Sequence, residues 1–134
     1  MPSEGLSDYT EPLLKDCYIC RRVDDFFTRY MDTFFYLWKK DADFRDKIKS
    51  SKGFCLQHFG QLYDLAPKHL KQSQLDEFTD LLVKIQDENF DRVIGDIEWF
   101  ITKFDYRFEN EPWKNSKDAV VRSIEKVASL KVNE

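Results

Sequence analysis

One long stretch of the chain, residues 68–104, constrains the fold most, because its apolar residues recur at three- and four-residue spacing. That spacing puts them on one face of an α-helix. The stripe consists of Leu75, Phe78, Leu82, Ile85, Val93, Ile97, Phe100 and Phe104, with the polar Asn89 either within it, where it could fix the register of a helix pair, or at its edge. Turn-forming residues are scarce, with 4 Gly and 4 Pro in 134 residues, which is too few for a fold of many strands. We therefore predict an all-α fold.

Three other helices and one short helix follow from the same patterns. The first is predicted over residues 16–39, capped by Asp16, with an apolar stripe of Val23, Phe27, Tyr30, Phe34 and Leu37. A short helix is predicted over 43–50, and another from Phe54 to the residue before Pro67. The last covers 116–130, capped by Ser116, with an inward face of Val120, Ile124 and Val127.

The predicted architecture is a bundle of four main helices with a short extra helix. Its length suits one domain, residues 16–134, after a flexible N-terminal arm of residues 1–15.

Composition excludes several classes of protein. Aromatic residues make up 16% of the chain, which excludes intrinsic disorder. A net charge of -4 makes nucleic acid an unexpected partner, because only a local basic patch could bind it. The sequence has no run of about 18 apolar residues that could span a membrane. It also lacks the basic and apolar regions of a secretory signal at its start, so we expect a cytoplasmic protein with reduced thiols.

Two quartets with the same internal spacing, CYIC at residues 17–20 and CLQH at 55–58, contain all three cysteines of the chain. Thiolate and imidazole are the ligands that zinc prefers, and structural zinc sites are four-coordinate. We predict one structural zinc ion, bound by Cys17, Cys20, Cys55 and His58, that ties two N-terminal helix ends together. The second histidine, His69, is expected to face solvent.

A shared ion sets a geometric condition on the predicted helices. The short helix has to run back alongside the first helix if Cys17 and Cys55 are to meet. The alternatives are buried or redox-active thiols, and a different metal centre such as an iron–sulfur cluster.

Three segments carry a resemblance to a known kind of protein: CYICRRVDDFFTRYMD, GFCLQH and WFITKFDYRFENEPWKNSKDAVVRSIEKV. They resemble an uncharacterised bacterial family, found mainly in Firmicutes and known only as a domain of unknown function. The resemblance covers most of the chain and implies a helical, cytoplasmic protein with a cysteine-rich metal motif. It matches at Cys17, Cys20, Cys55 and His58, whereas Tyr18 stands where a C-P-x-C knuckle has proline.

The segment of residues 103–118 is the second place where chemistry could reside. Its charges and rings could form a recognition surface in which Arg107 holds a carboxylate or phosphate and an aromatic ring stacks on a flat group. The candidate residues are Lys103, Asp105, Tyr106, Arg107 and Trp113. In the alternative, the aromatic residues anchor the loop on the core and the charged residues bridge backbone groups.

No catalytic residue is predicted, because the sequence contains no glycine-rich phosphate loop, no H-E-x-x-H and no G-x-S-x-G. We expect a non-enzymatic, zinc-containing helical module that binds a protein or peptide, with a homodimer among the expected partners. The alternative is a metal-dependent enzyme or a thiol/zinc redox sensor with an open or labile ligand position.

Overall fold

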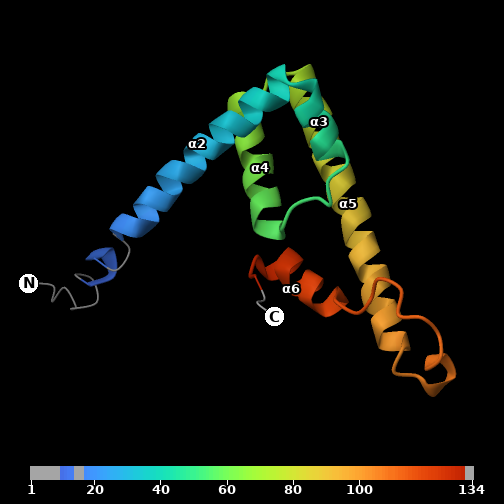
Figure 1. The fold of residues 1–134 in the computed structure, drawn as a ribbon. Coiled ribbons are helices and arrows are strands. Elements are labelled where there is room, and N and C mark those ends of the chain that lie inside the picture. Colours follow the sequence, from blue (N-terminus) through green and yellow to red (C-terminus); the bar gives the residue numbers. More distant parts are fainter. Residues whose placement is uncertain (1–9, 14–16, 132–134) are drawn as a thin grey trace, which may run out of the picture.

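The computed structural model describes residues 10–13 and 17–131, and the regular secondary structure in these ranges is all helical. The elements shown in Figure 1 are α2 (Tyr18–Lys40), α3 (Ala42–Lys49), α4 (Leu56–His69), α5 (Ser73–Thr102), the 3-10 turn η1 (Tyr106–Phe108) and α6 (Ala119–Ala128). The prediction of an all-α fold is confirmed. Most of the predicted arm, together with the predicted cap Asp16, lies outside the described residues.

The core forms where the C-terminal half of α2 meets α4 and the first half of α5. Its fully buried members are Phe35, Trp38, Leu62, Ala66, Leu70, Phe78 and Leu82. Phe78 makes edge-to-face contacts with Phe35 and Trp38, at centroid distances of 5.3 and 5.1 Å. His69 was predicted to face solvent, which is wrong, because its ring is half-buried and stacks on Phe35 at 4.7 Å.

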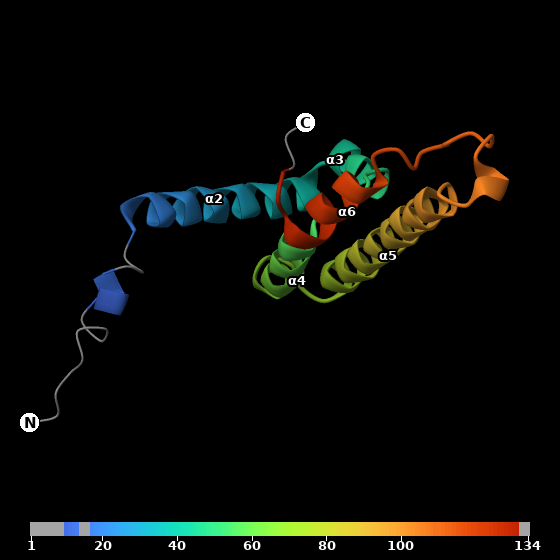
Figure 2. The same cartoon turned by 90° about the horizontal axis from the view of Figure 1, so that it is seen from below.

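The predicted stripe of the first helix packs along only half of its length. Phe34 and Leu37 are partly buried near the core, but Val23 and Tyr30 are exposed. Both views show the N-terminal half of α2 extending away from the other helices (Figures 1 and 2). A stripe of correct helical spacing therefore exists where no other part of the described chain covers it.

The short helix α3 does not return along α2. Asp41 ends α2 in extended geometry and caps α3, its side chain accepting a hydrogen bond from the Phe44 N–H. From this corner α3 runs downward in the view of Figure 1, and it does not turn back along α2. The return that a shared ion requires is thus not made in this structure.

The helix predicted to stop before Pro67 continues to His69, so this boundary was wrong. Pro67 lies in the last turn, where a missing N–H removes one hydrogen bond from the helix. The Leu70 N–H still closes the turn on the Ala66 carbonyl at 2.8 Å, and both residues are buried. Gln72 then adopts φ 45°, which reverses the chain, and α5 starts at Ser73 rather than at residue 68.

The last helix is shorter than predicted, and its predicted inward face is wrong. It begins after Asp118, while Ser116 is buried and donates its hydroxyl hydrogen bond to the Trp113 carbonyl. Val120, Ile124 and Val127 are each more than 40% exposed. The helix lies beside α5, between it and the start of α4 (Figure 1), and among the described residues nothing covers much of its apolar face. None of the described helices is long and apolar enough to cross a membrane.

Candidate metal centre

The Cys55–His58 pair is held in place by a buried glutamine on α5. The Phe54 N–H donates to Gln86 Oε1 at 3.0 Å, and Gln86 Nε2 donates to the Phe54 carbonyl at 2.7 Å. Lys126 of α6 donates to the Lys52 carbonyl at 2.7 Å. Gly53, between them, has φ 71°, a backbone conformation that favours glycine. These ties fix the chain entering α4 and so fix the position of Cys55, the N-cap of that helix.

The ligand atoms of the pair face each other. Cys55 Sγ lies 3.1 Å from His58 Nδ1 in the first turn of α4. Two such ligands on one zinc ion lie about 3.6 Å apart, given Zn–S and Zn–N bonds of about 2.3 and 2.05 Å. An ion would therefore have to widen the pair by only about half an ångström. The His58 ring also stacks on Phe27 of α2, at a centroid distance of 5.9 Å.

The Cys17–Cys20 pair opens α2 in the same way. Cys17 is the N-cap residue, and its pKa is lowered, chiefly because its sulfur accepts hydrogen bonds from the backbone N–H and the thiol of Cys20. The pKa of Cys20 is raised by the same thiol contact and by the negative charge on Cys17. The helix start therefore places the two thiols near enough to interact and favours the thiolate at Cys17.

The structure brings each pair together, but it does not bring the two pairs to one point. Cys20 precedes Phe27, the α2 residue that touches His58, by seven residues, which is about 10 Å along the helix. Both views show the N-terminal end of α2 lying away from that of α4 (Figures 1 and 2). Among the described residues, no cluster of three or more His, Cys, Asp or Glu side chains is arranged to hold a metal ion.

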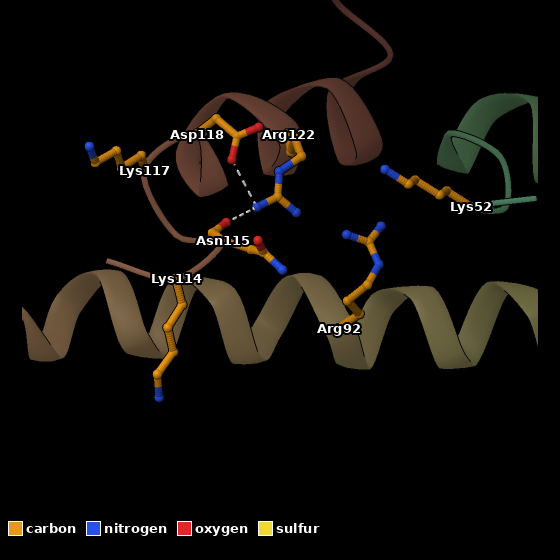
Figure 3. Close-up of a pocket in the computed structure, with 7 residues that line it drawn as sticks. All are labelled: Lys52, Arg92, Lys114, Asn115, Lys117, Asp118 and Arg122. Carbon is orange, nitrogen blue, oxygen red and sulfur yellow. Dashed lines mark hydrogen bonds and ion pairs between the residues drawn. The ribbon is translucent and has the colours of Figure 1, made fainter. Parts of the chain in front are cut away.

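A cationic hollow, which sequence reasoning missed, adjoins Cys55. Lys52, Arg92 and Arg122 point toward one another between α5 and α6, whereas Lys114 and Lys117 point away (Figure 3). The hollow has a volume of about 340 Å³. A neighbouring hollow of about 260 Å³ shares Lys52, Arg92 and Arg122 with it and is lined by Cys55 as well.

Carboxylates neutralise part of this positive charge. Arg122 donates to Asp96 at 2.9 Å and to Asp118 at 3.0 Å, and it also bonds the Asn115 carbonyl. The pKa of Asp118 is lowered mainly by the hydrogen bond from Arg122. The pKa of Lys126, at the edge of the hollow, is lowered by burial and by the charge of Arg92. Cationic side chains from three separate segments thus remain near Cys55.

The charged residues of the predicted recognition segment are used mainly within the segment itself. Lys103 is buried, and its ammonium donates to the carbonyls of Phe108, Glu109 and Glu111 at 2.7, 2.8 and 2.5 Å. Arg107 pairs with Asp105 through two side-chain nitrogens, which lowers the pKa of that carboxyl. Both interactions agree with the alternative prediction, in which the charged residues of this segment stabilise the loop itself.

The aromatic members of that segment differ in exposure. Trp113 is half-buried against Phe100, with ring centroids 5.9 Å apart, and Lys103 Nζ lies 5.3 Å from the Trp113 centroid. Tyr106 is 83% exposed. Of the five candidates, Tyr106 and Arg107, whose side chain is 66% exposed although it pairs with Asp105, are therefore the ones open to a partner.

The residues that sequence reasoning missed are those that hold the candidate ligands in place. Gln86 follows a residue of the apolar stripe, and a polar residue beside such a stripe was the one local signal for it. The convergence of Lys52, Arg92, Arg122 and Lys126 had no local signal, because these residues are spread over 75 positions and meet only where α6 packs beside α5.

Together, the fold and the two ligand pairs define an all-helical protein with a candidate thiolate–imidazole site. The chain belongs to the family of unknown function DUF6062, whose family model matches residues 2–134. The resemblance to an uncharacterised domain family is thereby confirmed. Comparison with curated proteins and with solved structures gives no match.

Proposed function

We propose that this protein is a zinc-binding helical module that associates with another protein or peptide. The observation that carries the proposal is the contact of Cys55 Sγ with His58 Nδ1 at 3.1 Å; at the other quartet, the thiols of Cys17 and Cys20 interact and shift each other's pKa. A C-x2-C or C-x2-H pair at a helix start can offer two ligands to one ion. Both quartets have that form here, so together they provide the four ligands of a closed zinc site.

The charge around Cys55 supports the same ligand set. Three thiolates and a neutral imidazole leave a divalent zinc centre at about -1, which is unfavourable when buried without compensation. Lys52 and Arg92 line the hollow that contains Cys55, and Lys126 closes its edge. These cations would stabilise the bound centre in a way that neutral surroundings would not.

A structural role is the role that suits a site with four protein ligands, since no position is left for water or substrate. The proposed site also requires three reduced cysteines, a condition met in the cytoplasm of a bacterium. Protein association is supported by exposed apolar side chains on α2 and α6, which are arranged in stripes rather than scattered.

One observation favours a second candidate function, a thiol-based redox sensor. Cys17 and Cys20 are in contact at a helix start, and the pKa of Cys17 is lowered. Reactive cysteines share these features. The two functions differ in what protects the thiols, because zinc ligands react slowly and sensor thiols react rapidly.

Metal analysis of the purified full chain tests the proposal. We expect about one zinc per chain, slow thiol labelling, and loss of the metal in Cys55→Ser and in Cys17→Ser. Ser73→Ala, at the exposed start of α5, is the matched control and should keep its zinc. A chain that takes up no zinc when supplied with it, and whose Cys17 is labelled rapidly, would exclude the zinc function in favour of the sensor.

A further inference from the structure

We infer that each zinc ion is shared between two copies of this chain: Cys17 and Cys20 come from one copy, and Cys55 and His58 from its partner. The inference rests on the proposed zinc function and names the partner of that site. In a symmetric dimer the exchange is reciprocal, so two chains would hold two ions.

The two candidate ligand pairs do not meet within one chain. Each pair has its donor atoms together, yet the pairs are separated along α2, and α3 does not make the return that would join them. A four-coordinate zinc ion needs two further ligands at each pair. A second copy is the one partner known to carry the missing pair, and it carries that pair at a matching helix start.

The half of α2 that carries the cysteines presents an uncovered apolar face. Ile19, Val23, Phe26 and Tyr30 recur at four-, three- and four-residue spacing, and they are 48–70% exposed. That spacing gives one continuous stripe on a helix. Such a stripe is typical of a helix that packs against another surface, and within the described chain nothing packs on this one.

A receiving surface lies beside Cys55. An apolar groove of about 430 Å³ runs between α5 and α6, with Phe90, Ile94, Ile97 and Val127 among its lining residues. Val93 and Lys126 line both this groove and the hollow that contains Cys55. The groove is thus continuous with one ligand pair, just as the α2 stripe is continuous with the other.

Exchange of the projecting half of α2 between two copies satisfies all of these features at once. The stripe of one chain would lie in the groove of its partner, and the two thiols at its end would reach the partner's hollow. The cations Lys52, Arg92 and Lys126 would then offset the negative charge that the incoming thiolates bring.

Mixing two inactive variants tests the sharing directly. One full-length variant carries Cys17→Ser and Cys20→Ser, and the other carries Cys55→Ser and His58→Ala. Each variant alone lacks two ligands at every site and should lose tight zinc binding. An equimolar mixture, combined without metal and then given zinc, should form a mixed dimer with one complete site, so we expect about one zinc per two chains.

The outcomes separate the sharing from the zinc function itself. Wild type that binds one zinc per chain as a dimer, with zinc restored in the mixture, supports the inference. Wild type that binds one zinc per chain as a monomer, or a mixture that binds no zinc, overturns the sharing and leaves the zinc function in place. Wild type without zinc overturns both.

A surface variant gives an independent readout. Val23→Glu and Phe26→Glu place charges on the α2 stripe and leave all four ligands unchanged. We expect this variant to lose dimerisation and to bind zinc at least ten-fold more weakly, as measured by light scattering and competition with a chelator. The same two charges placed at Thr28→Glu and Tyr36→Glu, exposed positions of α2 off the stripe, should leave both properties unchanged. Tight zinc binding by a monomeric stripe variant would contradict the inference.

Discussion

Gln86 and the backbone of Phe54 bond to each other in both directions, through bonds of 3.0 and 2.7 Å. One buried side chain on α5 thus satisfies the N–H and the carbonyl of the residue that precedes Cys55. If these backbone groups were buried without such partners, each unsatisfied group would make the folded protein less stable.

Replacing Gln86 by Leu should therefore destabilise the protein. The substitution leaves both backbone groups of Phe54 without their partner, and we expect the free energy of unfolding to fall by about 2–3 kcal/mol. Urea denaturation followed by circular dichroism measures the change. Gln74→Leu, an exposed position in the first turn of α5, is the control and should change stability by less than about 0.5 kcal/mol. Equal effects at the two positions would show that the bonds to Phe54 contribute nothing.

Two glycines should respond to alanine in opposite directions. At Gly53 the backbone has φ 71°, and an added Cβ would lie 2.9 Å from Gln86 Oε1 and 3.0 Å from Lys126 Nζ. Gly53→Ala should reduce the free energy of unfolding by about 1–2 kcal/mol. At Gly95, inside α5, an added Cβ meets no atom within 4 Å, so Gly95→Ala should increase it by about 0.5–1 kcal/mol. Thermal melts of the two variants give the comparison, and a shared direction would contradict the assigned conformations.

Lys103 is expected to hold the loop after α5 in shape. Its buried ammonium is bonded to three carbonyls, so Lys103→Met should cost about 2–4 kcal/mol and should expose residues 108–113 to rapid amide exchange. Lys117→Met, an exposed lysine in the same segment, is the control. If amide exchange in residues 108–113 stays slow in Lys103→Met, the three bonds do not order the loop.

Acid should weaken the link between the start of α6 and its neighbours. The pKa of Asp118 in the folded chain is lowered by Arg122, so the ion pair contributes its full stability above the unfolded pKa of about 3.9. The contribution is lost as the pH falls through the lower, folded pKa. Because Asp118 is largely exposed, the contribution is at most about 1 kcal/mol.

Asp118→Asn tests this dependence. The variant should be less stable than wild type at pH 7, and the difference should shrink as the pH falls below about 4. Chemical denaturation across that range measures it. In an Arg122→Gln background the same substitution should have little effect on the acid profile, and a persistent effect would assign the pH dependence to another partner.

The helices were predictable because their signals are local. The stripe from Leu75 to Ile97 needs only helical spacing, and Phe78, Leu82, Ile85 and Val93 of that stripe are buried. The two ligand pairs were predictable for the same reason, since three-residue spacing at a helix start is enough to bring Cys55 and His58 into contact. Whether all four ligands bind one ion stays a prediction.

The failures concern information that is not local. The stripe on α6 is as regular as the one on α5, yet Val120 and Ile124 remain exposed, because periodicity shows which face is apolar and not what covers it. The prediction that the helix ends before Pro67 failed for another reason. The rule that proline ends a helix ignores the stabilisation gained when Ala66 and Leu70, on either side of it, are buried in the core.

The projecting part of α2 also has a consequence for local opening. The first turns of this helix, before Phe27 meets His58, project from the other helices, and an isolated helix that short is not stable in water. Amide protection should therefore decrease along α2 from Trp38 toward Cys20, in steps that follow the helical turns. A zinc ion bound by the two thiols would therefore also stabilise the first turn of this helix against opening.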